Sequence, residues 1–125
     1  MQGEQALLPE FEKGIAEFNR CQFFECHETL EALWQHQGEP ERQFTQGIIQ
    51  IAVGFYHLLR NNRTGAQRLF ERGLGRIRRF PPDHLGLNMH EFAHAVADNL
   101  SILKTTPVDE QIDFAVPEII IGGKG

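Results

Sequence analysis

Apolar residues recur every three or four positions along most of the chain, which is the period of an amphipathic α-helix. Five such segments are predicted, over about residues 9–20, 23–37, 41–60, 64–79 and 87–103. The third segment is apolar on two sides, so we expect it to be central and packed between neighbours. The pattern therefore predicts an all-α fold, a compact bundle of about five helices.

The helical pattern fades after Thr105. The remaining residues contain two prolines, a β-branched run at 119–121 and a glycine-rich end. This composition predicts an extended C-terminal tail over residues 105–125, docked on the bundle or on a second subunit, which would make the protein a homo-oligomer. We therefore expect one helical bundle domain over residues 1–104, followed by this tail.

The composition is typical of one globular domain: 41% of the 125 residues are apolar, and there are 12 glycines. No window approaches the ~18 consecutive apolar residues of a membrane span, and the N-terminus lacks the apolar core of a signal peptide. We therefore expect a soluble, cytoplasmic protein that does not contact a membrane. Two cysteines, Cys21 and Cys26, are too few for a disulfide framework or a zinc ribbon.

The net charge of −5 conceals opposed blocks of charge along the chain. Residues 1–41 carry −7, residues 42–79 carry +7 and residues 80–125 carry −5. An acidic first third beside a basic middle indicates internal charge complementarity before it indicates a nucleic-acid partner.

Arginines recur at helical spacing along the outward side of the predicted fourth helix: Arg68, Arg72, Arg76 and Arg79. Such a row could bind phosphates or an acidic protein. The chain offers no interleaved aromatic side chains and is negative overall, which argues against nucleic acid as a partner. We favour a solvated face, or salt bridges to the acidic second helix.

The candidate chemistry lies on the second and third predicted helices. His27 and Glu31 are one helical turn apart, so their nitrogen and oxygen atoms can point to one place, as a divalent metal or an acid–base pair requires. On the third helix, Gln46, Gln50 and His57 fall within a sector of about 40°. Because the connection is short, the two helices should be antiparallel neighbours, and the two sets should meet.

These positions define a candidate pocket between the helices. We predict that it is lined by Phe24, His27, Glu31, Trp34, Gln46, Gln50 and His57. A divalent metal would be held by His27, Glu31 and His57, and a proton would be accepted by Glu28 or Glu31. The pocket would bind that metal or a small polar ligand. The alternative is a structural polar network inside a non-catalytic interaction module, which contacts a protein partner or itself.

His90-Glu91-Phe92-Ala93-His94 spells the zinc-peptidase pattern, in which His90 and His94 bind Zn²⁺ and Glu91 acts on a metal-bound water. The apolar stripe of this helix lies far from both histidines, and the chain lacks the sheet on which such enzymes hold substrate. A zinc-dependent hydrolase is therefore only a remote alternative.

The motifs themselves resemble a known family. Its first block is matched by Phe18-Asn19, by the run Phe23-Phe24-Glu25-Cys26-His27-Glu28, and by Leu30-Glu31 and Trp34. Its second and third blocks are matched by Gln46-Gly47-Ile48-Ile49-Gln50-Ile51-Ala52 with His57, and by Ala66, Leu69 and Gly73-Leu74. The chain resembles, over about residues 8–87, the uncharacterised family called domain of unknown function 309. The resemblance implies a helical fold and singles out the candidate pocket, but it supplies no reaction.

Overall fold

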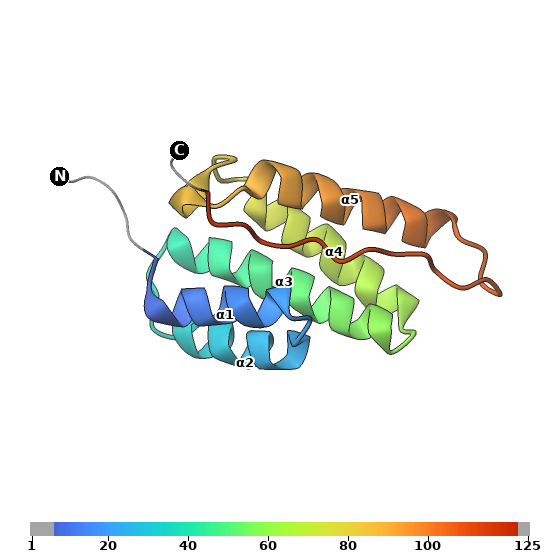
Figure 1. Ribbon diagram of the computed structural model, residues 1–125, viewed down its shortest axis with the longest axis horizontal. Coiled ribbons are helices and arrows are strands. Elements are labelled where there is room, and N and C mark those ends of the chain that lie inside the picture. Colours follow the sequence, from blue (N-terminus) through green and yellow to red (C-terminus); the bar gives the residue numbers. More distant parts are fainter. Residues whose placement is uncertain (1–6, 123–125) are drawn as a thin grey trace.

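A computed structural model describes residues 7–122, which form five α-helices (Figure 1). The helices are α1 (Pro9–Asn19), α2 (Phe23–Trp34), α3 (Glu41–Leu59), α4 (Arg63–Ile77) and α5 (Met89–Thr105), with a short 3₁₀ turn at His84–Gly86. The predicted all-α bundle is therefore confirmed. The first six residues of the predicted domain and the last three of the predicted tail lie outside the described residues.

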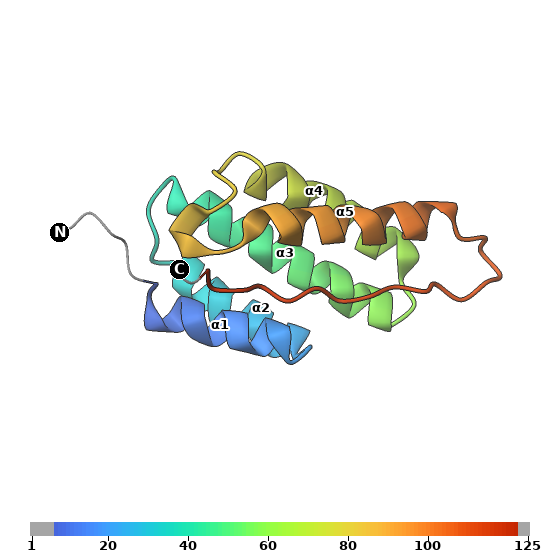
Figure 2. The same cartoon turned by 45° about the horizontal axis from the view of Figure 1, so that its top comes forward.

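Helix α3 is the centre of the bundle. It packs against α2 on one side and α4 on the other, while α1 packs on α2 and α5 packs on α4 (Figures 1 and 2). Phe44, Ile48, Ile51 and Phe55 of α3 are fully buried. This place in the fold explains why the sequence of α3 is apolar on two sides.

A fully buried phenylalanine, Phe18 of α1, joins four helices at the core. Its ring centroid lies 5.2 Å from that of Phe23, 6.0 Å from that of Phe55 and 5.5 Å from that of Phe92, each in an edge-to-face arrangement. Such aromatic pairs add about 0.5–1.5 kcal/mol each beyond the area that they bury. Phe18 thus fixes how α1 sits against α2, α3 and α5.

Residues 106–122, named here the C-terminal strap, make a turn at residues 107–110 and then run in an extended conformation along the bundle (red in Figure 2). Two asparagine side chains hold it. The Asn99 side chain donates to the Ala115 carbonyl (2.7 Å) and accepts from the Ala115 N–H (3.0 Å). Asn19 donates to the Ile119 carbonyl (2.9 Å) and accepts from its N–H (2.8 Å). Each asparagine satisfies both backbone groups of one strap residue.

The strap is also held at its two ends. Arg63 at the start of α4 donates to the carbonyls of Thr106 and Glu110. At the other end, Ile121 forms an antiparallel bridge with Leu87, and Ile119, two residues earlier, is buried. The predicted extended tail therefore docks on the bundle of its own chain.

Several helix ends differ from the prediction by one to three residues. Helix α4 begins at Arg63 rather than Thr64, since Asn62 is the N-cap and its side chain accepts from the Gly65 N–H. Helix α5 begins at Met89 rather than at residue 87, and α2 ends at residue 34 rather than 37.

No helix of residues 7–122 is both long and apolar enough to span a membrane.

Candidate functional site

A groove of about 130 Å³ lies between α2 and α3, where the sequence predicts a pocket. It is lined by Phe23, Phe24, His27, Val53, Tyr56 and His57. We name it the α2–α3 groove. The ring centroid of Phe24 lies 6.1 Å from that of His27 and 6.0 Å from that of Tyr56. Of the seven predicted pocket residues, the groove unites Phe24, His27 and His57. It adds Phe23, Val53 and Tyr56, whose apolar and aromatic side chains carried no chemical signal in the sequence.

His27 and Glu31 are neighbours, as their spacing predicts. The Nε2 atom of His27 lies 3.7 Å from Oε1 of Glu31, whose side chain is 49% exposed. Glu28 is exposed as well. An ion pair that is this open to water contributes only about 0–1 kcal/mol. The two carboxylates predicted as proton acceptors thus belong to the solvated side of α2.

The hydrogen bonds around His57 determine where its ring proton lies. Because the Gly65 N–H donates to Oδ1 of Asn62 (3.0 Å), the amide nitrogen of Asn62 faces His57. That nitrogen lies 3.3 Å from Nδ1 of His57 and can only donate. The neutral His57 ring therefore accepts at Nδ1 and carries its proton on Nε2.

Gln50 does not join the histidines, contrary to the prediction. Its Oε1 atom accepts from Nε of Arg76 on α4 (3.1 Å), and the Arg76 guanidinium also donates to the Gln43 side chain. Arg76 was predicted to point outward, but it is half-buried and connects α3 to α4. The polar sector of α3 is therefore divided: Gln50 faces α4, whereas His57 lines the groove against α2.

The other predicted lining residues lie away from the groove. The guanidinium of Arg42 stacks over the Trp34 ring, 3.9 Å from its centroid. Gln46 is half-buried outside the groove lining. Residues 7–122 contain no group of three histidine, cysteine, aspartate or glutamate side chains placed to hold a metal ion. His27, Glu31 and His57 thus do not assemble into the predicted triad of ligands.

The zinc-peptidase pattern lies at the start of α5, where Glu91 has a structural partner. Asn88 is the N-cap of α5: its side-chain oxygen accepts from the Glu91 N–H (3.4 Å), and its amide donates to the Glu91 carboxylate (3.3 Å). This reciprocal pair resembles a capping box, which stabilises a helix start. His94 lies beside Asp98, with 3.5 Å between Nδ1 and Oδ2. The described residues supply no third ligand for a zinc ion.

The exposed arginines of α4 have no acidic helix opposite them. Helix α4 packs against α3 and α5, and none of its arginines forms an ion pair with a carboxylate of residues 7–122. Of the two interpretations that we favoured for this row, the salt bridges to α2 are therefore wrong. Arg68, Arg72 and Arg79 instead form a solvated face.

Comparison with known proteins confirms the predicted resemblance. Residues 11–69 match the model of the family described as "Domain of unknown function (DUF309)". The chain is also 42% identical over 57 residues to "Uncharacterized protein YpuF" of Bacillus subtilis (strain 168), which covers 44% of this chain and 33% of that protein. The aligned part thus spans about a third of the length of this curated relative. The family match contains every residue of the α2–α3 groove.

Proposed function

We propose that this domain is a non-catalytic interaction module, in which the α2–α3 groove receives one apolar side chain of a basic protein segment. The volume of the groove carries this proposal. Small-molecule sites usually enclose roughly 300–1,000 Å³, whereas about 150 Å³ suffices for one benzene ring. The α2–α3 groove, at about 130 Å³, has the size of a single side chain.

The wall of the groove supports an interaction of this kind. Phe24 is 50% exposed, although it lies beside Tyr56 and His27. Aromatic side chains next to a small hollow are frequent anchors of protein interfaces, because they bury much area at little entropic cost. A partner side chain in the groove would cover the Phe24 ring.

The acidic α2 side of the groove favours a basic partner, whereas on the α3 side the Arg60 guanidinium lies over the Tyr56 ring, 5.3 Å from its centroid. Glu25, Glu28 and Glu31 are exposed along α2, and none of them forms an ion pair with a lysine or arginine of residues 7–122. Complementary charges at the rim of an interface speed association and select the partner. In this proposal Glu28 and Glu31 act through their charge rather than as proton acceptors.

The protonation of His57 favours this function over metal binding. Because Nδ1 of His57 accepts from the Asn62 amide, a metal ion could bind this ring at Nε2 only if the ring proton moved to Nδ1 and that hydrogen bond were lost. His57 is then a hydrogen-bond donor at the groove. This state suits a carbonyl or carboxylate of the partner segment better than a cation.

The test uses blocked peptides as probes, followed by two-dimensional NMR of the full chain. Lys-Lys-Phe-Lys-Lys should shift the backbone signals of Phe24, Tyr56 and His57. Lys-Lys-Ala-Lys-Lys, which has no anchor, and Glu-Glu-Phe-Glu-Glu, which has the wrong charge, should shift them much less. The variant Phe24→Ala should weaken binding by about 2- to 10-fold, as expected for one aromatic contact.

Leu59→Ala is the matched control, because Leu59 is similarly exposed but does not line the groove. An equal loss of affinity in both variants would contradict the proposal, and so would equal binding of the phenylalanine and alanine peptides. Zn²⁺ that displaces the peptide at micromolar concentration would instead support the metal site that the sequence predicted.

A further inference from the structure

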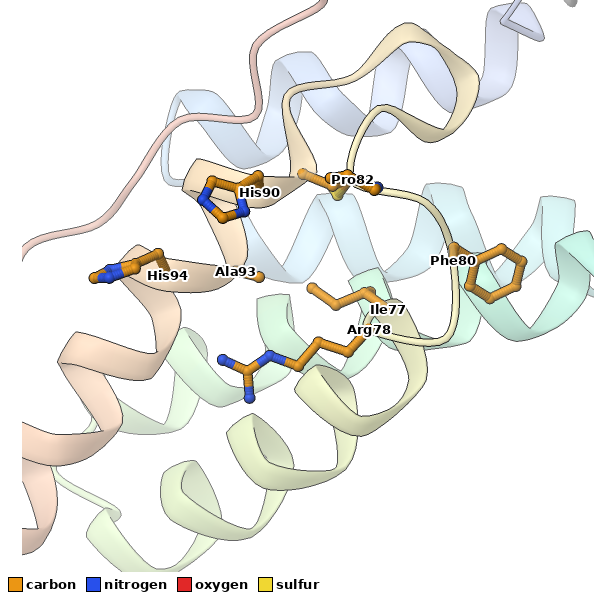
Figure 3. Close-up of a pocket in the computed structure, with 8 residues that line it drawn as sticks. Ile77, Arg78, Phe80, Pro82, His90, Ala93 and His94 are labelled. Atoms are coloured by element: carbon orange, nitrogen blue, oxygen red, sulfur yellow. The ribbon is translucent and has the colours of Figure 1, made fainter.

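A second and larger hollow lies between the end of α4 and the start of α5 (Figure 3). We name it the α4–α5 groove. Its volume is about 320 Å³, which falls within the usual range of small-molecule sites. Apolar lining is provided by Ile77, Phe80 and Ala93, and polar lining by Arg78, His90 and His94. This hollow lies outside the residues that match the family.

The polar side chains approach the hollow from two helices. Figure 3 shows the Arg78 guanidinium extending from α4 into the space beside α5, which carries His90 and His94 one turn apart. Ile77 and Ala93 face each other between these groups. A molecule in the hollow would therefore meet an apolar floor and a basic rim.

Every ionisable side chain that lines this hollow is basic. No carboxylate lines it, and Arg78 forms no ion pair with a carboxylate of residues 7–122. The nearby Glu91 is turned toward Asn88 by the helix cap, while Asp98 contacts His94 at Nδ1 and leaves Nε2 free. Arg78 thus retains its donors for a ligand.

The permanent positive charge of Arg78 changes which ligand the two histidines suit. A positive charge in the same hollow repels Zn²⁺, whereas it attracts an anion. Arginine binds phosphate or carboxylate through two parallel hydrogen bonds, and a protonated imidazole adds one more donor. His90 and His94 therefore fit an anion site better than the zinc site that their spacing suggests.

We propose that the α4–α5 groove binds a small organic molecule that carries a phosphate group on an apolar body. The phosphate binds to Arg78 with His90 and His94 beside it, and the apolar body packs on Ile77 and Ala93. A phosphate monoester carries about −1.5 to −2 charges and three acceptor oxygens, which match three basic groups. A carboxylate offers one charge and satisfies Arg78 alone.

Phenyl phosphate is the probe, titrated into the full chain and followed by NMR of the backbone and of the histidine rings. The ring signals of His90 and His94 should shift, and benzoate should bind several-fold more weakly. Benzyl alcohol, which lacks the anion, should bind weakest of the three. The variant Arg78→Ala should weaken phenyl phosphate by at least about 10-fold, the effect of a charge-assisted hydrogen bond.

Arg79→Ala is the matched control, since it removes the same charge from the next position and Arg79 does not line the hollow. It should change the affinity less than about 2-fold. Equal losses in both variants, or histidine signals that do not move, would overturn the proposal. So would a single-stranded RNA that binds more tightly than phenyl phosphate and depends equally on both arginines, because it would show a general polyanion surface. Because both arginines are exposed, both variants should fold. Neither outcome bears on the function proposed for the α2–α3 groove.

Discussion

The two cysteines lie five positions apart and have opposite surroundings. Cys21 is exposed after α1, whereas Cys26 is fully buried on the inner side of α2. Burial raises the pKa of the Cys26 thiol from 9.0 to about 12; the charge of Glu17 adds to this effect, and a hydrogen bond with the Phe18 backbone opposes it. Because the thiolate is the reactive form, Cys26 should be inert in the folded protein.

Stability should therefore fall at high pH through Cys26. Between pH 9 and about 12 the unfolded thiol loses its proton while the folded thiol keeps it. The free energy of unfolding should then decrease by up to ~1.4 kcal/mol per pH unit. Urea unfolding between pH 8 and 10 measures this slope, which Cys26→Ala should make shallower and Cys21→Ser should leave unchanged. Rapid labelling of two thiols in the folded protein at pH 8 would contradict the argument.

At the scale of the elements, α3 and α4 approach closely because two glycines face each other. A Cβ atom added at Gly73 would lie 2.9 Å from the Gly47 carbonyl oxygen and 2.6 Å from a side-chain carbon of Ile51. A Cβ added at Gly47 would lie 2.7 Å from a side-chain carbon of Ile77. The close contact between the backbones also lets Arg76 reach Gln50.

The variant Gly73→Ala should therefore destabilise the protein by about 1–3 kcal/mol, the usual effect of overpacking. Thermal unfolding should show a lower Tm. Gly75→Ala on the same helix is the matched control, because nothing lies within 4 Å of its added Cβ. This control should stabilise α4 by up to ~1 kcal/mol through helix propensity. Similar losses of stability in the two variants would mean that the glycine contact does not determine the packing.

The period of apolar residues predicted every helix, but it could not predict which helix faces a given polar side chain. Spacing along one helix is enough to place His27 beside Glu31. The partner of Gln50 depends on how α3 rotates against α4, and Arg76 was assigned to solvent because it belongs to the arginine row on the outward side of its helix. The start of α4 could not be fixed from the sequence either, because Asn62 and Thr64 are both suitable N-cap residues. In the folded chain Asn62 is the N-cap.

At the scale of the whole molecule, the C-terminal strap connects elements from both ends of the chain. Asn99 is buried and binds Ala115, while Asn19 binds Ile119, which lies 100 positions away in the sequence. The sequence predicted an extended tail from its composition. It could not identify the two asparagines, because contacts between such distant residues leave no periodic pattern.

The variant Asn99→Ala should release the middle of the strap. It removes the hydrogen bond to the Ala95 carbonyl and the two hydrogen bonds with Ala115, and it leaves both backbone groups of Ala115 without their partner, at a cost of about 1–3 kcal/mol. Hydrogen exchange should show lost protection of the Ala115 N–H, and proteases should cut the strap faster. Thr105→Ala is the control, since that hydroxyl bonds only to its own helix. If the Ala115 N–H stayed protected in Asn99→Ala, apolar contacts alone would be holding the strap.

The pairing of Asn19 with Ile119 also implies an order of events during folding. If the strap docked before the bundle formed, the contact between Asn19 and Ile119 would close a loop of 100 residues. Once α5 is in place, only about 14 residues separate Ile119 from Thr105 at the end of that helix. The difference in loop-closure entropy is about 2 kcal/mol in favour of the second route. The helices should therefore assemble first and the strap should dock last, so that its detachment is the earliest step of unfolding.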